Sequence, residues 1–196
     1  MTIFSAALLL FLVMDPLGNI PMYLTALKNV PDERRTRVIM RELLIALAVM
    51  VIFLFAGQHF LSALHISEPA LTTTGGVVLF LIAIKMIFPP AGGPHKVANE
   101  EEPFIVPLAI PYVAGPSTIA TIILIMNGEP DRWLEWLAAL GGAWFVCGII
   151  LLCATPLAKI LRNRGLIAIE RLMGMILVAI AIQMLMNGIT QFVATL

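Results

Sequence analysis

The stretch Asp15-Pro16-Leu17-Gly18-Asn19-Ile20-Pro21 interrupts an otherwise apolar run that covers residues 3–27. A carboxylate at the centre of a bilayer costs about 2.5–3.5 kcal/mol on insertion scales, and proline removes a backbone donor from a helix. At about 1.5 Å per residue, Asp15 falls roughly 18 Å along a helix that begins at residue 3, near the middle of a hydrocarbon layer about 30 Å thick. We therefore predict a broken membrane helix whose interruption is buried in protein or lines a polar cavity.

The composition is that of an integral membrane protein. Of the 196 residues, 60% are hydrophobic and 12% are charged, and the mean hydropathy is +0.99, which is too apolar for a soluble domain of this length. The 12 basic and 12 acidic residues cancel, so the net charge gives no indication of a nucleic-acid partner. The first apolar run has no basic residue before it and no small-residue cleavage site, so we interpret it as a retained span.

Six apolar runs of about 20 residues, long enough to cross a bilayer as helices, follow one another along the chain. They predict an all-α membrane protein of six transmembrane helices, in which helices 1 and 4 are broken. The runs cover residues 3–27, 38–64, 69–88, 104–126, 134–157 and 169–192.

The six runs divide into two halves, 1–88 and 104–196, joined by a predicted cytoplasmic linker, 89–103, that is rich in proline, glycine and charge. A glycine, a leucine, an Ile-Ala-Ile triplet and a methionine recur between 76–86 and 174–184 at a constant offset of 98 residues. Because each half has an odd number of spans, the second must insert upside down. We predict two inverted three-helix repeats.

Positive charge predicts the orientation. Of the 12 Lys and Arg residues, 11 flank the first, third and fifth connections, and Arg132 alone lies on the other side. The positive-inside rule therefore assigns those three connections to the cytoplasm and both termini to the periplasmic side.

The fourth run is interrupted as the first is, by Pro107, Pro111 and then Gly115-Pro116-Ser117-Thr118. Two broken helices in corresponding positions indicate the binding site of a transporter. Asp15 before Pro16, and Gly115 before Pro116, have the pattern of an N-cap followed by a proline at the first helical position. We predict that a half-helix starts at each and that the two N-termini face each other near the midplane.

A cavity between these ends suits a zwitterion, because one end carries a carboxylate and the other only unpaired N–H groups. We predict that the ammonium of a small amino acid lies at Asp15, beside Gly18 and Asn19, and that its carboxylate lies at Gly115, Ser117 and Thr118. In the alternative interpretation, Asp15 only caps its helix or pairs with a cation, and the prolines at 16, 21, 111 and 116 only kink the chain.

Signals for other chemistry are weak. His59, His65 and Glu68 lack the spacing of metal ligands on one helical face, and no phosphate-binding glycine loop or activated nucleophile is present. We expect no catalytic residue, metal or cofactor, and no enzymatic activity. Glu42 and the Glu170-Arg171 pair are interpreted as interfacial anchors at cytoplasmic span ends.

The motif at 15–21, together with Ala114-Gly115-Pro116-Ser117-Thr118-Ile119-Ala120, resembles the MarC family of bacterial inner-membrane proteins over essentially the whole chain. The resemblance implies a six-span inverted-repeat fold similar to that of the lysine-exporter group, and one archaeal branch of the family is described as transporting small neutral amino acids. The family usually has a glycine where this chain has Ser117, so a hydroxyl is added to the motif here.

Sequence and resemblance together predict an inner-membrane secondary transporter of a small neutral amino acid or similar zwitterion. Asp15 is compatible with proton or sodium coupling. The expected partners are the small-molecule substrate and the lipid bilayer, and a homo-oligomer is left open. Two other classes also remain open: an intramembrane lipid-handling protein or enzyme, and a non-transporting accessory factor that binds a partner or anionic lipids.

Overall fold

The computed structural model describes residues 1–27, 30–88 and 113–194. All regular structure in these ranges is helical, as predicted. The helices are α1 (Ile3–Met14), α2 (Ile20–Ala26), α3 (Asp32–Ala63), α4 (Glu68–Ile87), α5 (Pro116–Gly128), the 3-10 turn η2 (Pro130–Arg132), α6 (Trp133–Leu152) and α7 (Ala154–Val193). The predicted linker 89–103, and residues 104–112 with Pro107 and Pro111, lie outside the described ranges.

Within the described part of the chain, four segments are long and apolar enough to cross a membrane: Glu33–Ala63, Glu68–Ile87, Pro130–Leu152 and Arg164–Val193. They lie in the second, third, fifth and sixth predicted spans. Two shorter apolar helices, Ile3–Met14 and Pro116–Gly128, lie in the first and fourth. A helix of 12 residues rises only about 18 Å, so α1 alone is too short for a hydrocarbon layer of about 30 Å.

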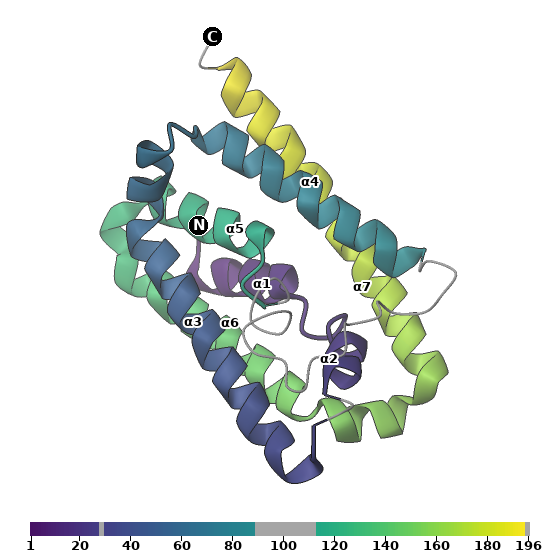
Figure 1. Ribbon diagram of the computed structural model, residues 1–196. Helices are drawn as coiled ribbons and strands as arrows, with labels where there is room; N and C mark the ends of the chain where they lie inside the picture. The colour runs from purple at the N-terminus through teal and green to yellow at the C-terminus, as the bar shows by residue number, and fades with distance from the viewer. Residues whose placement is uncertain (28–29, 89–112, 195–196) are drawn as a thin grey trace.

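The long helices form two pairs with the short helices between them (Figure 1). Helix α4 lies beside α7, and α3 lies beside α6. Helix α1 packs on α6 and α5, while α5 also contacts both α3 and α4. The interrupted segments are therefore enclosed by the long helices, where a broken backbone is tolerated at membrane depth.

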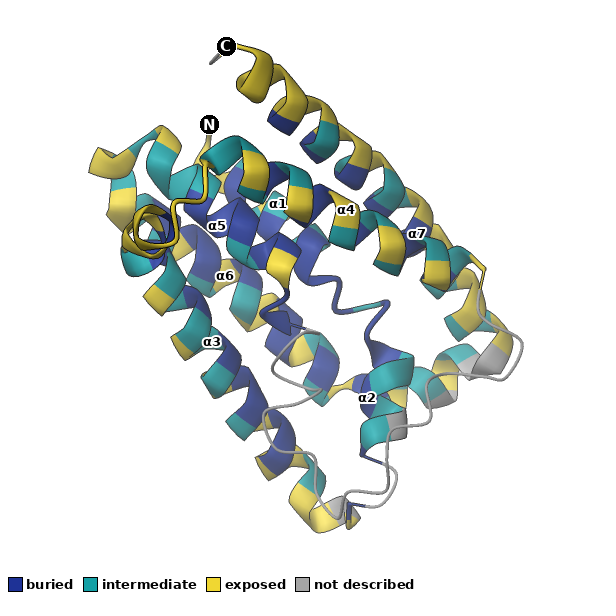
Figure 2. Cartoon of the chain, turned by 45° about the horizontal axis from the view of Figure 1, so that its top comes forward, coloured by how far each residue is buried: buried dark blue, intermediate teal, exposed yellow. Residues whose placement is uncertain are grey.

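The core has two parts that correspond to these pairs. One cluster of buried apolar side chains joins α1, α3 and α6, and the other joins α4 and α7. In the first, the Trp144 indole nitrogen donates to the Leu43 carbonyl at 2.8 Å and ties α6 to α3. Figure 2 shows buried residues facing inward and exposed residues along the outer surfaces. Large apolar side chains such as Phe4, Phe145 and Ile160 are exposed there, which suits a surface in contact with lipid.

Helices α4 and α7 approach closely at several glycines, two of which make matching contacts. A Cβ built on Gly76 would lie 3.0 Å from the Ala181 carbonyl oxygen, and one built on Gly174 would lie 3.0 Å from the Ala83 carbonyl oxygen. These are the positions that the offset of 98 relates, since Gly76 corresponds to Gly174 and Ala83 to Ala181. The contact is therefore reciprocal, as in a two-fold interface.

Polar bonds hold the C-terminal end of α5. The Asn127 amide donates to Glu68 at 2.9 Å and to Gln58, which connects α5 to α4 and α3. On the other side, the Trp136 indole nitrogen donates to the Glu129 carbonyl at 2.8 Å. This end of α5 is thus fixed to three neighbouring helices, while its N-terminal end begins at the second interruption.

Candidate functional site

The first interruption is a compact turn built on Asp15. Asp15 is the C-cap of α1, in the left-handed conformation with φ 44° and ψ 60°, which aspartate adopts more readily than most residues. Its backbone N–H bonds the Phe11 and Leu12 carbonyls, and its carbonyl accepts from Asn19 N–H at 3.1 Å. The side chain, 5% exposed, accepts the Gly18 N–H at 3.1 Å through Oδ1.

Asn19 completes the turn from the other side. Its amide nitrogen donates to the Met14 carbonyl at 2.9 Å, which satisfies an acceptor left at the end of α1. Its own carbonyl accepts from Tyr23 N–H at 2.9 Å, so α2 continues directly from it. Two polar side chains therefore supply the hydrogen bonds that the broken helix loses.

This geometry includes the side-chain bond to the N–H three residues ahead that an N-cap makes, but the helix predicted to start at Asp15 does not start there. Asp15 ends α1, and α2 starts at Ile20, beyond the turn. The positive φ at Asp15 stops the first helix, and the bond between its carboxylate and the Gly18 N–H turns the chain before the next helix starts. Pro16 therefore lies in the turn and Pro21 in the first turn of α2.

Only glycine fits at position 18, because the Asp15 carboxylate and the Met86 side chain lie close to its Cα. A Cβ at this position would lie 2.1 Å from Asp15 Oδ2 and 2.3 Å from the terminal methyl of Met86 in α4. Any side chain would displace the carboxylate from the turn. Gly18 thus fixes the Asp15 side chain in place.

The second interruption matches its prediction. Gly115 is the N-cap of α5, with extended backbone and no side-chain cap, and Pro116 follows within the first turn. Ser117 and Thr118 are buried, at 3% and 1% exposure. This helix end carries no acid of its own, so it keeps the partial positive charge of a helix N-terminus.

The two interruptions contact α4 at different levels. A Cβ built on Gly75 would lie 3.6 Å from Ser117 Cα, whereas Gly18 packs against Met86. Gly75 and Met86 are about 16 Å apart along the axis of α4. The Met86 side chain points back toward the start of the helix and covers part of that distance. The predicted residues thus form two groups: Asp15, Gly18 and Asn19 at one level, and Gly115, Ser117 and Thr118 at the other.

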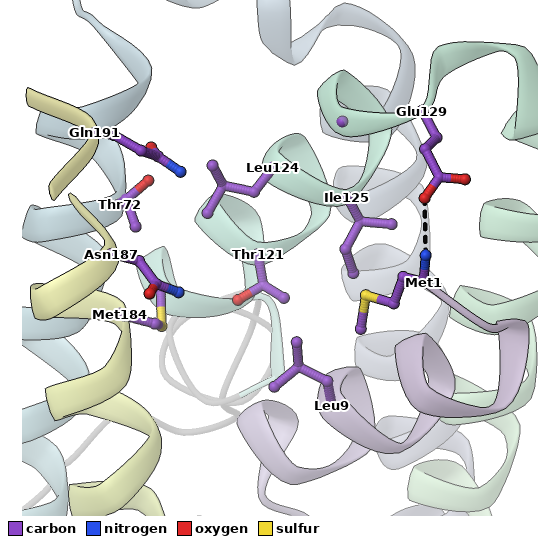
Figure 3. Close-up of a pocket in the computed structure, with 11 residues that line it drawn as sticks. Met1, Leu9, Thr72, Thr121, Leu124, Ile125, Glu129, Met184, Asn187 and Gln191 are labelled. Carbon is purple, nitrogen blue, oxygen red and sulfur yellow. Dashed lines mark hydrogen bonds and ion pairs between the residues drawn. The ribbon is translucent and has the colours of Figure 1, made fainter. Parts of the chain in front are cut away.

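A pocket of about 290 Å³ opens beside the second group, between α1, α4, α5 and α7 (Figure 3). Thr121 lies in its wall and donates to the Ser117 carbonyl at 2.8 Å, one turn along α5. The lining residues are Met1, Leu9, Thr72, Thr121, Leu124, Ile125, Gly128, Glu129, Met184, Asn187 and Gln191. This mainly apolar pocket therefore adjoins the break in the fourth span and lies away from the Asp15 turn.

Sequence reasoning missed the polar residues of this pocket, although a signal was present. Gln183, Asn187 and Gln191 are spaced four apart in an apolar run, which aligns them on one face of α7. Polar side chains inside membrane spans usually face the protein interior or a wet cavity.

The interpretation of Glu42 as an interfacial anchor also differs from the structure. Glu42 is fully buried in α3 and bonds the Arg41 guanidinium at 2.9 Å.

Comparison with known proteins identifies the family. The sequence model of the family described as "MarC family integral membrane protein" matches residues 1–193. The chain belongs to the MarC family. MarC relatives include the UPF0056 inner membrane protein YhgN of Escherichia coli (strain K12), 48% identical over 188 residues covering 95% of each chain. A UPF0056 membrane protein of Buchnera aphidicola subsp. Schizaphis graminum is 46% identical over 187 residues, again 95% of each chain.

A more distant UPF0056 membrane protein, from Chlamydia pneumoniae, is 33% identical over 190 residues that cover 95% of this chain and 93% of the relative. No solved structure matches. The family match confirms the resemblance inferred from the two motifs. Together with the apolar helices and the YhgN match, it identifies a multi-pass inner-membrane protein.

Proposed function

We propose that this MarC protein is a secondary transporter of a small neutral amino acid or a similar zwitterion, and that it works by alternating access without a catalytic step. The observation that carries the proposal is the position of Asp15. Its carboxylate is 5% exposed and lies in the interruption of an apolar segment. An ionisable residue inside a membrane is costly and usually marks a path for a solute or ion.

The proposed architecture is two inverted three-span repeats. The reciprocal contacts of Gly76 and Gly174 across α4 and α7 support it. The helix pairs support it too: α5 packs on α4 and α2 packs on α7, and a two-fold relation between the halves would exchange these pairs. Such repeats commonly move against each other around a site at their interface.

The proposed path runs from the pocket of Figure 3, past Ser117 and Thr118, to the Asp15 turn. With the termini on the periplasmic side, the pocket opens toward the periplasm, because its lining includes Met1, Glu129 and Gln191 near the predicted outer ends of their segments. Asp15 would then bind the ammonium group, or take up a coupling proton or cation, on the cytoplasmic side of the second break.

Counterflow in liposomes tests the proposal. The purified chain is reconstituted in vesicles loaded with unlabelled glycine, alanine or serine, and uptake of the labelled amino acid is followed over time. The proposal predicts transient accumulation that protein-free vesicles lack. Turnover of the vesicle lipids would favour an enzyme instead, and the absence of both activities would favour an accessory role.

A further inference from the structure

Two methionines occupy matching positions in the paired helices α4 and α7. Met86 and Met184 are related by the offset of 98 residues that also relates Gly76 to Gly174. Because these two glycines make reciprocal contacts across the interface of α4 and α7, the methionines lie at equivalent places on either side of it. Both are buried, with 3% of Met86 and 8% of Met184 exposed.

The terminal methyl of each methionine lies at a different interruption. The Met86 methyl is at the first, 2.3 Å from the position that a Cβ on Gly18 would take. The Met184 methyl is beside the second, because a Cβ built on Gly75 would lie 3.2 Å from that methyl and 3.6 Å from Ser117 Cα. Helices α4 and α7 thus each direct a flexible apolar side chain to one of the two breaks.

The surroundings of the two methionines differ. Met184 lines the pocket of Figure 3, whereas Met86 is not among the described residues that line it. Met86 is instead the last buried residue of α4, which ends at Ile87 and is followed by the exposed Phe88. Met86 therefore lies between the Asp15 turn and the end of α4 that is predicted to be cytoplasmic.

A second pair of matching positions supports this comparison. Glu170 of α7 lies close enough to Asp15 for the two carboxylates to interact electrostatically. By the same offset, Glu170 corresponds to Thr72, which lines the open pocket. The region around Asp15 is therefore the counterpart of the open pocket, and the side chain that covers it is Met86.

We propose that Met86 is the cytoplasmic gate of the transport path. Its side chain covers the Asp15 turn in this structure, and its movement away opens the turn to the cytoplasm. Methionine is unbranched and has three rotatable bonds, so it can make this change while α4 stays in place. Met184 is the equivalent group at the outer end of the path. The gate rests on the proposed function, since a gate is needed only if a solute passes Asp15.

Chemical labelling of Asp15 tests the gate without requiring transport. Inside-out membrane vesicles, which expose the cytoplasmic face, are treated with a water-soluble cationic carbodiimide and an amine, and the modified carboxyl groups are quantified by mass spectrometry of peptides. Glu33, exposed at the start of α3, is the internal standard. Met86→Ala should raise the labelling rate of Asp15 about tenfold or more, because truncating a buried methionine removes more contact energy than a tenfold change requires.

Matched variants separate a gate from ordinary packing. Met184→Ala removes the same atoms at the equivalent position on the outer side, so it should lower the melting temperature as Met86→Ala does and leave the labelling of Asp15 unchanged. Met86→Leu nearly conserves the volume and should keep the labelling low. Met86→Val shortens the side chain, should raise the labelling in the same direction as alanine, and replaces Met86→Ala if that chain does not fold.

The outcomes distinguish the gate from the proposed transport. Labelling of Asp15 that is unchanged in Met86→Ala and Met86→Val, or raised equally by Met184→Ala, would overturn the gate. If counterflow is present in the unchanged chain at the same time, the proposed transport still stands. The expected labelling pattern without any counterflow would contradict transport and support closure of the Asp15 turn by Met86.

Discussion

The two interrupted segments meet the same physical demand in different ways. Both must satisfy backbone groups at membrane depth. At the first, the side chains of Asp15 and Asn19 bond the Gly18 N–H and the Met14 carbonyl, so the turn is closed on itself. At the second, Gly115 provides no cap, and the helix that starts there leads within two turns to the wall of an open pocket.

The two interruptions were predicted to line one cavity, but this difference suggests that they have separate roles. The first turn holds its acid in a fixed position, with the Gly18 N–H bonded to Asp15 Oδ1. An uncapped helix end beside a hollow can receive a solute without first breaking local bonds. We therefore expect substitutions that break the first turn, at Gly18 and Asn19, to affect stability, and substitutions beside the second interruption to affect ligand binding.

The largest stability effect should follow Gly18→Ala. The added methyl would lie 2.1 Å from Asp15 Oδ2 and 2.3 Å from the Met86 methyl, so the Asp15 carboxylate and the end of the Met86 side chain must move. Overpacking of this kind costs about 1–3 kcal/mol. Thermal unfolding in detergent measures it. Gly141→Ala is the control, because nothing lies within 4 Å of its added Cβ, and a melting temperature equal for both variants would contradict the tight turn.

Asn19→Ala should have the next largest effect. It removes the donor to the Met14 carbonyl, which is left inside the protein without that bond. An unsatisfied buried acceptor costs about 1–3 kcal/mol. Because Asn19→Ala adds no atoms that clash, we expect it to lower the melting temperature less than Gly18→Ala does in the same unfolding measurement. No change in melting temperature would mean that the side chain of Asn19 does not support the break.

The two halves can be compared through Gly76→Ala and Gly174→Ala. Each added methyl would lie 3.0 Å from a backbone carbonyl of the facing helix, Ala181 or Ala83. Part of the clash is offset by the gain of about 0.5–1 kcal/mol that alanine brings to a helix interior. We expect net losses of about 1 kcal/mol, similar for the two variants. Unequal losses in thermal unfolding would count against reciprocal halves.

The smallest expected effect is the contribution of Glu129 to the pH dependence of the melting temperature. Bonds from the Met1 amine and from Arg132 hold the pKa of this carboxyl below its usual value of 4.5. A lowered folded-state pKa means that the interaction stabilises the fold above pH 4.5 and is lost as the pH falls through the folded pKa. Melting temperature followed down from pH 6 should fall less steeply for Glu129→Gln. Identical slopes would contradict the ion pair.

Much of this architecture is readable from the sequence because the bilayer constrains it strongly. Apolar length marked the spans, and the proline and glycine interruptions marked the breaks at Asp15 and Gly115. The form of the first break was not readable. The carboxylate of Asp15 does bond the Gly18 N–H three residues ahead, as an N-cap would, but its left-handed backbone ends α1, and the next regular helix starts only at Ile20.

The pocket was harder to predict because it depends on how helices approach each other. Thr72, Thr121 and Asn187 come from three helices that only the packing of α4, α5 and α7 brings together. Glu42 shows the same limit. Its position near a span end suggested the interface, whereas the packing of α3 buries it completely beside Arg41.

Asp15→Asn tests the central claim, that the buried acid serves a solute path and is more than a helix cap. Asparagine keeps a side-chain oxygen for the Gly18 N–H and tolerates the left-handed backbone, so the fold should survive. Counterflow of labelled alanine is measured for both proteins, with melting temperature alongside. We expect a near-normal melting temperature and a loss of most of the counterflow. Undiminished counterflow in Asp15→Asn would contradict it.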